Sequence, residues 1–462
     1  MKKVTAVFDI GKTNKKFFLF DRNYKEVYKE YTKFDEIQDE DGFPTENLPA
    51  LQKWLKDLFN RILSANEFDI RAINFSTYGA SFVHLDKKGN VIAPLYNYLK
   101  PLPKKITEEF YQDHGDPLII ATETASPSAE MLNSGMQLYW LKHTQPALFA
   151  SIKYSLHFPQ YISFLFTGIP VSEFTSIGCH TALWDYKKNT YHQWVINQEI
   201  DIKFPFIIPT QTSFNMIYNG KRIKIGIGIH DSSSALIPYL LGEKKPFVLI
   251  STGTWSITLN PFSTNPLSKK DIKNNCLNYL KVDGKPVRAT RFFMGNEYKA
   301  QVKKLCEHFS KPKEHHKNII FDPHLYRKLK NDNKKYFRFK EIRIDNDNTV
   351  SETNLSLFSS FEEAFHQLMI ELVAIQVKTT KLAIGHSNIK KIYIDGGFTD
   401  NEIFIKLIAL HFKEYKVRTT KSPLGSALGA AMVISDQKLD SRFLKDNYQM
   451  QKLQPPVLQI QE

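Results

Sequence analysis

Two similar units stand half a chain apart, and they constrain the fold more than any other feature of this sequence. In residues 4–20 an apolar strand carries Asp9 near its end, a turn begins at Gly11, and a second apolar strand begins at Phe17. Residues 246–259 repeat this order around a turn at Gly253. Such glycine turns expose backbone N–H groups that can bind phosphate. One unit alone is a weak signal, but two of them predict two similar domains that face each other, each with a phosphate-binding hairpin.

The chain length supports this division. The sequence has 462 residues, too many for one ordinary core, so two domains are expected. Hydrophobic residues make up 42% and charged residues 24%, which is usual for a soluble globular protein. Lys and Arg number 62 against 48 Asp and Glu, a net charge of +14. The lysines are spread thinly without a basic arm, so we expect a charged surface that favours phosphorylated ligands, and no nucleic-acid partner.

Cysteine usage and the apolar runs indicate the compartment. The three cysteines, Cys179, Cys276 and Cys306, are far apart and match neither a zinc spacing nor a disulfide framework. This pattern suits a reducing compartment. The first residues turn polar after one strand length, unlike a signal peptide, and no apolar run approaches the ~20 residues that span a bilayer. We therefore expect a cytoplasmic protein that does not enter a membrane.

Residues 221–239 hold the strongest candidate for a catalytic group. Alternating isoleucines indicate a strand, and Gly226 and Gly228 within it indicate a close approach to the backbone. His230 and Asp231 follow at the strand's end, and an apolar helix comes next. A carboxylate in this position lies where open α/β sheets bind ligands. The alternative interpretation is that Asp231 only caps the helix, which aspartate does well.

Other segments complete the predicted organisation. Helical spacing of apolar residues predicts helices at residues 51–63 and 361–375. A strand at 72–75 leads into a turn, and one at 392–394 leads into a glycine elbow of the kind that can hold a nucleotide against backbone. Residues 423–431 form a helix with a small-residue face, which suits either a neighbouring helix or a nucleotide base. The lysine-rich residues 262–350 are expected to be an insertion or surface subdomain.

Taken in order, these segments resemble the FGGY family of carbohydrate kinases, within the superfamily of sugar kinases, heat-shock ATPases and actin. The resemblance rests on DIGKTN, GIHDSSSAL, STGTW, DGGFTDN, SPLGSALGAA and, most specifically, residues 134–168. It covers nearly the whole chain. It implies an α/β fold of two ribonuclease H-like (actin-like ATPase) domains with a deep inter-domain cleft. The first domain would be residues 1–237 and the second, which binds ATP, residues 238–455.

The resemblance also implies a role for each motif. Asp231 would be the general base that takes the proton from a sugar hydroxyl, and Asp9 would hold Mg²⁺, through water because Mg²⁺ dehydrates reluctantly. The remaining implied contacts are with ATP and the sugar. The expected ATP contacts are Gly11, Lys12, Thr13, Asn14, Thr252, Gly253, Thr254, Gly396, Gly397 and Asn401. The expected sugar contacts are Thr77, Tyr78, Gly79, Tyr96, Asn97, Tyr98, His230 and Asp231.

Departures from the family pattern bear on the substrate. Lys12 stands where the family usually has a small hydroxyl residue, and Gln137 replaces a common lysine. A W-x-D-x-R-like sugar motif is absent, and Tyr96, Asn97 and Tyr98 stand near its usual place. Tyrosines offer an apolar face with a polar tip, which suits a sugar carrying a methyl group.

We therefore expect a ketose substrate, L-rhamnulose or L-fuculose, with ATP and Mg²⁺ as cofactors and a homodimer as one possible assembly. The alternatives are a kinase for xylulose, ribulose or glycerol, and a superfamily member that binds ATP without kinase activity. The segment at residues 134–168 and the aspartate in the base position argue against the second alternative.

Overall fold

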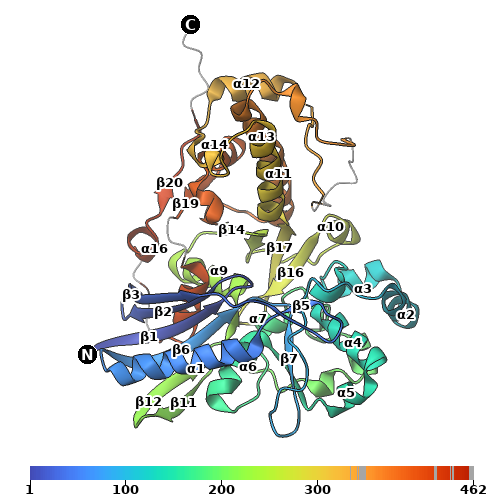
Figure 1. Cartoon of the computed structure of the whole chain (residues 1–462), viewed down its shortest axis with the longest axis vertical. Helices are drawn as coiled ribbons and strands as arrows, with labels where there is room; N and C mark the ends of the chain where they lie inside the picture. Colours follow the sequence, from blue (N-terminus) through green and yellow to red (C-terminus); the bar gives the residue numbers. More distant parts are fainter. Residues whose placement is uncertain are drawn as a thin grey trace.

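The computed structural model describes residues 1–332, 334–340, 342, 350–420, 424–436, 439 and 442–456, and the statements below concern these residues. Two seven-stranded sheets form the frame of the molecule. Figure 1 shows the sheet of the N-terminal half in the lower part and that of the C-terminal half above it. This is the predicted α/β class with two sheet-containing domains.

The first sheet has the order β11-β12-β6-β1-β2-β3, and β13 pairs with β6. β1 runs antiparallel to β2 and parallel to β6. The first predicted phosphate-binding hairpin, at Gly11, is therefore the turn between β1 and β2. The strands are β1 (Lys2–Ile10), β2 (Lys15–Asp21), β3 (Glu26–Thr32), β6 (Phe68–Thr77), β11 (Ser213–Tyr218), β12 (Lys221–Gly226) and β13 (Ile229–His230).

The second sheet has the order β16-β17-β15-β14-β18-β19-β20 and repeats that arrangement. β14 runs antiparallel to β15 and parallel to β18, as β1 does to β2 and β6. The predicted repeat of strand, glycine turn and strand is thus present. The strands are β14 (Phe247–Thr252), β15 (Ser256–Asn260), β16 (Cys276–Leu280), β17 (Pro286–Phe292), β18 (Lys391–Gly396), β19 (Lys416–Thr419) and β20 (Gln451–Lys452).

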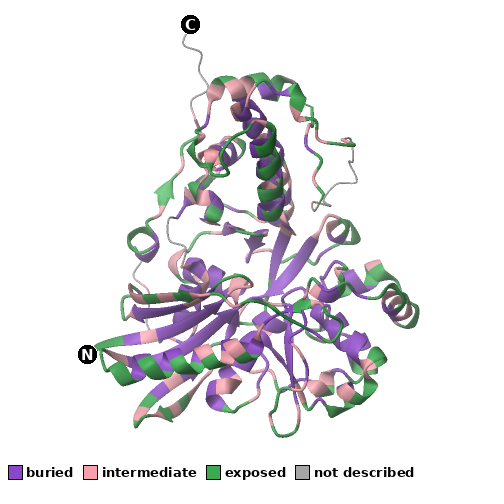
Figure 2. Ribbon diagram, in the orientation of Figure 1, coloured by how far each residue is buried: buried purple, intermediate pink, exposed green. Residues whose placement is uncertain are grey.

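Helices cover both sheets. α1 (Leu48–Ala65) starts where Asn47 accepts a hydrogen bond from the Ala50 N–H, and it buries its leucine-rich face. α6 (Phe158–Thr167) packs on β6 and β12. In the C-terminal half, α11 (Met294–His308), α12 (Pro323–Asp332), α13 (Phe361–Ile384) and α14 (Glu402–His411) share one apolar cluster with the sheet. Figure 2 shows α13 largely buried and α11 exposed along one face.

The remaining helices are short or lie beside the first sheet. They are α2 (Lys104–His114), α3 (Pro117–Glu123), α4 (Ser134–Thr144), α5 (Pro146–Ser151), α7 (Phe174–Ile177), α8 (Gln193–Asn197), α10 (Lys269–Lys273) and α16 (Phe443–Asp446). Three two-stranded ribbons pair β4 (Ile37–Gln38) with β5 (Pro44–Thr45), β7 (Phe82–Leu85) with β8 (Tyr154–His157), and β9 (Trp184–Asp185) with β10 (Thr190–Tyr191).

Two helices join the halves. α9 (Asp231–Gly242) and α15 (Gly425–Val433) pack so closely that a Cβ on Gly429 would lie 1.8 Å from the Ser234 carbonyl oxygen. α15 also touches the first sheet, because the Asn74 amide donates 2.7 Å to the Ala430 carbonyl. The small residues of this helix therefore serve helix packing. The predicted helix start at Pro423 lies outside the described residues, and the expected domain boundary at 237/238 falls within α9.

The expected insertion at residues 262–350 differs from what the structure contains. β16 and β17 from this range are strands of the second sheet, and α11 packs on α13. Cys276–His308 is thus built into the domain rather than into a separate surface subdomain. Most lysines of this range are exposed, while Val287–Thr290 and Phe292 of β17 and the apolar side of α11 are buried.

The predicted close approach at Gly226 and Gly228 comes from the protein itself. A Cβ on Gly226 would lie 2.3 Å from the Asn74 side-chain oxygen, and one on Gly228 would lie 2.5 Å from the Pro159 carbonyl oxygen. Gly228 also has φ +83°, which favours glycine. The strand predicted at 223–229 is therefore interrupted between β12 and β13.

Candidate active site

A cavity of about 440 Å³ lies between the two halves, where the two glycine hairpins face each other. Both halves contribute to its wall, as expected for an inter-domain cleft. The described lining residues are Lys12, Thr13, Tyr78, Gly79, Ala80, Tyr98, Leu99, Leu132, His180, His230, Asp231, Ser232, Ser251, Thr252, Gly253, Thr254, Trp255, Ile257, Tyr279, Arg291 and Phe293.

Asp231 is the carboxylate of this cavity. It is the first residue of α9, and the capping position before it belongs to His230, whose side chain makes no capping hydrogen bond. Asp231 Oδ1 accepts hydrogen bonds from the Ser232 N–H at 2.6 Å and the Ser232 hydroxyl at 3.2 Å. Burial raises the pKa of Asp231 to about 6, and the Ser232 hydrogen bonds only partly oppose this rise. A carboxyl group with this pKa is mostly ionised at pH 7 and can accept a proton.

His230 lies beside this carboxylate as a neutral side chain. Burial lowers the pKa of His230 to about 4, so its ring is uncharged at neutral pH. Its Nε2 lies 3.2 Å from Asp231 Oδ1, and its Nδ1 lies 3.3 Å from the Ser233 hydroxyl. A Cβ on Gly79 would lie 3.0 Å from the His230 ring. The glycine therefore allows the turn after β6 to reach the histidine.

The first hairpin is closed by the Gly11 N–H, which donates 2.9 Å to the Asn14 carbonyl. Lys15 is buried and donates to the Gly11 and Lys12 carbonyls at 3.2 and 3.1 Å. The same ammonium pairs with Glu46 at 2.8 Å. The Lys12 side chain extends to Glu36 at 2.7 Å. Lys15 thus fixes the shape of the turn, while Lys12 brings a paired charge to the cavity wall.

The second hairpin is held by its neighbours in the C-terminal half. The Gly253 N–H donates 2.9 Å to the Trp255 carbonyl. The Thr252 hydroxyl donates 2.6 Å to the Asp395 carbonyl. A Cβ on Gly295 would lie 2.1 Å from the Gly253 carbonyl oxygen, so the start of α11 presses on the turn. The turn is therefore fixed by backbone packing on both sides.

Asp9 and Asp395 lie one residue before the ends of β1 and β18, and both are buried. Burial raises the pKa of Asp9, and the nearby negative charge of Asp231 raises it further. Burial likewise raises the pKa of Asp395 to about 6, although it accepts a hydrogen bond from the Tyr239 hydroxyl. Among the described residues no group of three or more His, Cys, Asp or Glu side chains forms a cage for a metal. Isolated carboxylates fit Mg²⁺, which keeps waters and phosphate oxygens as its other ligands.

The residues expected at the adenosine lie outside the lining of this cavity. Gly396, with φ +89°, packs so that a Cβ would lie 1.8 Å from the Thr252 carbonyl oxygen. A Cβ on Gly397 would meet no atom within 4 Å, so this residue borders open space. Asn401 caps α14 by accepting 2.9 Å from the Phe404 N–H. The glycine elbow thus supports the second hairpin directly.

The expected sugar contacts divide into two groups. Tyr78, Gly79, Tyr98, His230 and Asp231 line the cavity, whereas Thr77, Tyr96 and Asn97 do not. The Tyr96 ring packs edge-on against Trp140, and its hydroxyl donates to Glu40. The Asn97 amide donates 2.8 Å to the Pro44 carbonyl. Burial raises the pKa of Tyr98 to about 12, with the charge of Asp231 as a second cause, so Tyr98 remains a neutral hydroxyl beside the carboxylate.

Among the wall residues that sequence reasoning missed are His180, Tyr279 and Arg291. The rings of the first two cluster with His230, at 5.5 Å from Tyr279 and 6.5 Å from His180. His180 comes from the loop after α7, and the other two come from β16 and β17. For His180, the adjacent Gly178 and Cys179 in a loop offered a weak signal. Tyr279 and Arg291 lie on strands β16 and β17, within residues 262–350, for which the sequence predicts an insertion.

Comparison with known families supports the motifs. The N-terminal domain of the FGGY family of carbohydrate kinases matches residues 4–231, and the FGGY C-terminal domain matches residues 244–323. Together these matches cover more than half of the chain. The chain therefore belongs to the FGGY family of carbohydrate kinases, and the prediction of this family is confirmed.

One curated relative is a rhamnulokinase of Oceanobacillus iheyensis, which is 24% identical over 206 residues. That match covers 42% of this chain and 42% of the relative, so less than half of that relative's length is spanned.

Solved structures share the fold over nearly the whole chain. A carbohydrate kinase from Novosphingobium aromaticivorans has a TM-score of 0.76 at 21% identity, covering 98% of this chain and 94% of that one. A xylulose kinase from Rhodospirillum rubrum reaches 0.79 at 15% identity, with 98% and 94% covered. A gluconate kinase from Lactobacillus acidophilus reaches 0.77 at 17% identity, with 99% and 94% covered. The predicted actin-like ATPase fold is therefore confirmed. In the described part of the chain, no helix combines the length and apolarity that a membrane crossing requires.

Proposed function

We propose that this chain transfers the γ-phosphoryl group of ATP to a hydroxyl of a ketose, with Asp231 as the general base. The observation that carries the proposal is a single cavity that joins this carboxylate to both glycine hairpins. Phosphoryl transfer depends mainly on positioning, charge neutralisation and a base for the attacking hydroxyl. The cavity offers a group for each of these three tasks.

In this proposal the acceptor hydroxyl lies against Asp231, which takes its proton as the oxygen attacks phosphorus and ADP leaves. Neutral His230 stands beside this carboxylate, with its Nε2 3.2 Å from Asp231 Oδ1, and adds no charge of its own at pH 7. The phosphates bind to backbone N–H groups of the turns at Gly11 to Asn14 and Thr252 to Thr254 other than those of Gly11 and Gly253, which are bonded within the turns. Gly396, Gly397 and Asn401 border the adenosine. Asp9 would hold Mg²⁺ through water, and the ion would supply charge neutralisation for the phosphates.

For the acceptor we propose a 6-deoxy ketohexulose, L-rhamnulose or L-fuculose. Tyr78 and Tyr98 support this choice, because their rings give the cavity wall an apolar surface for a methyl group. The rhamnulokinase relative points the same way. One methyl group is worth only about 10–200-fold in discrimination, so the preference should be graded. Xylulose, ribulose and glycerol are the second candidates, and xylulose kinases among the similar structures favour the first of these.

An ADP-release assay tests the proposal with L-rhamnulose, L-fuculose, D-xylulose, L-ribulose and glycerol as acceptors. We expect acceptor-dependent ADP release, and the highest kcat/KM for a deoxy sugar. A pentulose or glycerol that leads by more than tenfold would refute the choice of sugar. ATP turnover that no acceptor stimulates would refute the kinase itself and favour an ATP-binding switch.

A further inference from the structure

A buried ion pair links the wall of the cavity to the first hairpin. Tyr78 lines the cavity, and its hydroxyl donates 3.1 Å to a carboxylate oxygen of Glu46. The same carboxylate pairs with the Lys15 ammonium at 2.8 Å. All three residues are buried. Burial raises the pKa of Tyr78 and the charge of Glu46 raises it further, so the hydroxyl stays protonated and donates.

Lys15 determines which way the peptide groups of the turn point. Its ammonium has three N–H donors. One pairs with Glu46, and the others go to the carbonyls of Gly11 and Lys12, at 3.2 and 3.1 Å. Because a trans peptide directs its N–H away from its carbonyl, the N–H groups of Lys12 and Thr13 point away from Lys15. Lys12 and Thr13 line the cavity, so Lys15 orients two of the donors proposed to bind phosphate.

Glu46 ends an acidic segment, residues 36–46, that contacts both the hairpin and the segment that carries Tyr98. Glu36 pairs with Lys12 of the hairpin at 2.7 Å. The other acidic residues of the segment hold the chain around Tyr98, through the pairs of Asp39 and Asp41 with Lys100 and of Glu40 with Tyr96. One segment thus supports both the turn that is proposed to bind phosphate and the wall that is proposed to bind the acceptor.

We propose that Glu46 is a positioning residue of the phosphoryl transfer, which couples an acceptor bound at Tyr78 to the phosphate-binding turn through Lys15. This rests on the proposed kinase reaction. An acceptor that packs on the Tyr78 ring fixes the hydroxyl on Glu46, and Glu46 then fixes Lys15 and the two carbonyls of the turn. Coupling between two sites is reciprocal, so a nucleotide on the turn favours the same arrangement of Tyr78. Each ligand therefore tightens the binding of the other, and Glu46 touches neither.

A second group of the same chemistry provides a matched control. Glu243 follows α9, pairs with Lys391 of β18 and accepts a hydrogen bond of 2.6 Å from the Tyr393 hydroxyl. These three described residues do not line the cavity. Changing either glutamate to glutamine removes the counter-charge of a mostly buried lysine, but only Glu46 connects the cavity to a hairpin. Effects on stability are thereby separated from effects on coupling.

The test measures the affinity of the full chain for a non-hydrolysable ATP analogue, with and without acceptor, by calorimetry. The acceptor is L-rhamnulose, or whichever of the other four acceptors gives a higher kcat/KM. We expect the acceptor to tighten binding of the analogue by at least about fivefold in the wild type. In Tyr78→Phe and Glu46→Gln this factor should fall below about twofold. Tyr393→Phe and Glu243→Gln should keep the wild-type factor.

Turnover and melting temperature distinguish positioning from folding. Glu46→Gln and Glu243→Gln should both lower Tm, because each leaves a lysine without its counter-charge. Only Glu46→Gln should also lower kcat, by about 10–100-fold, since it releases the turn. Tyr78→Phe keeps the ion pair, so it tests the link even if Glu46→Gln does not fold. The double variant of Tyr78→Phe and Glu46→Gln should show the coupling of the single variants, because both act through one path.

Four outcomes would overturn the proposal. If acceptor and analogue bind the wild type independently, Glu46 couples nothing, while acceptor-dependent ADP release still supports the kinase. If Tyr78→Phe and Glu46→Gln keep the wild-type factor, the ion pair with Lys15 only stabilises the fold. If Glu243→Gln loses the coupling equally, the loss follows from lower stability. If no acceptor is phosphorylated, the proposed function fails and this inference fails with it.

Discussion

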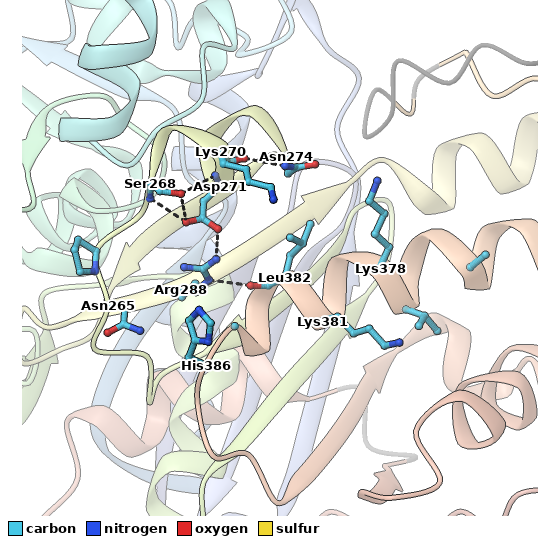
Figure 3. A pocket seen from close by; sticks show the side chains of 14 residues that line it. Asn265, Ser268, Lys270, Asp271, Asn274, Arg288, Lys378, Lys381, Leu382 and His386 are labelled. Atoms are coloured by element: carbon cyan, nitrogen blue, oxygen red, sulfur yellow. Dashed lines mark hydrogen bonds and ion pairs between the residues drawn. The ribbon is translucent and has the colours of Figure 1, made fainter.

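The two cavities on either face of β17 differ in a way that size does not reveal. The outer cavity, beside α10 and the end of α13, measures about 830 Å³ and is nearly twice the volume of the cleft cavity. It is rich in basic residues, but its arginine is paired and Lys270, Lys381 and His386 are exposed (Figure 3). The cleft holds a carboxylate with a raised pKa, two backbone turns and the guanidinium of Arg291, for which no ion pair forms within the described part of the chain. Unsatisfied charge and converging donors, rather than volume, distinguish the candidate active site.

The two cavities also differ in the pKa of their carboxylates, Asp231 in the cleft and Asp271 in the outer cavity. Burial raises the pKa of Asp231 to about 6. Burial would also raise the pKa of Asp271, but hydrogen bonds from Ser268 and Arg288 outweigh it and lower the pKa. Asp271 is thus held as a structural anion, while Asp231 can exchange a proton.

The largest expected effect is on turnover. Asp231→Asn removes the proton acceptor and should lower kcat by about 10²–10⁴ while leaving the affinity for ATP largely intact. Asp271→Asn changes the same chemical group in the outer cavity and should keep kcat within about twofold. Steady-state ADP release and nucleotide binding measure both. Near wild-type turnover of Asp231→Asn would return this residue to a structural role.

The next effect is the pH dependence of the cleft. Because the base must be ionised, kcat/KM should fall about tenfold for each pH unit below an apparent pKa of about 6. His230, with a pKa of about 4, stays neutral over this range and adds no second step. The Asp271→Asn variant should show the same profile, since that carboxylate does not reach the acceptor. A rate that stays constant down to pH 4.5 would contradict the assignment of the base.

A smaller effect is expected from the glycine elbow behind the second hairpin. Gly396→Ala places a methyl group against the Thr252 carbonyl at φ +89°, so steric overlap should cost about 1–3 kcal/mol of stability and raise KM for ATP. Gly397→Ala, one residue on, points into open space and should be nearly neutral for stability. Thermal unfolding and ATP titration of the pair measure the difference. Equal behaviour of the two variants would mean that the elbow does not support the hairpin.

Sequence alone predicted the parts of the site that are local. The two glycine turns, Asp231 at the end of a strand and the elbow at Gly396 each come from a short run of residues with its own pattern. Arg291 and Tyr279 could not be found this way, because they reach the cleft only through the antiparallel pairing of β15, β17 and β16, which joins distant segments.

Residues 96–98 show a second limit of prediction from sequence. Tyr96 and Tyr98 are two residues apart, and position in the chain gave both the same prediction. In the structure Tyr96 packs on Trp140 and pairs with Glu40, while Tyr98 borders the cavity. The segment lies outside any described strand or helix, so no periodicity in the sequence indicates which side chain turns inward.

The two carboxylates should also affect stability with opposite signs. The native pKa of Asp231 lies above its usual 3.8, so its ionised form costs stability above pH 6, and Asp231→Asn should raise Tm at pH 8. This gain should disappear below about pH 4, where the carboxyl is protonated in both states. The native pKa of Asp271 lies below 3.8, so its ion pair stabilises the fold at neutral pH and loses this contribution on acidification. Asp271→Asn should therefore lower Tm at pH 8, and shifts of the same sign for both variants would contradict the contrast.

The smallest effect is expected at the outer cavity. Its exposed lysines lie in solvent, where a single charge is screened and contributes little. The double change Lys270→Gln and Lys381→Gln should leave kcat, both KM values and the salt dependence of the reaction within about twofold of the wild type, because neither side chain reaches the acceptor or the hairpins. A change of more than about fivefold in turnover, or one that appears only when phosphate is added, would show that the outer cavity binds an anion that acts on the cleft. The two cavities would then differ only in their arginines, of which Arg288 is paired with Asp271 and Arg291 lines the cleft.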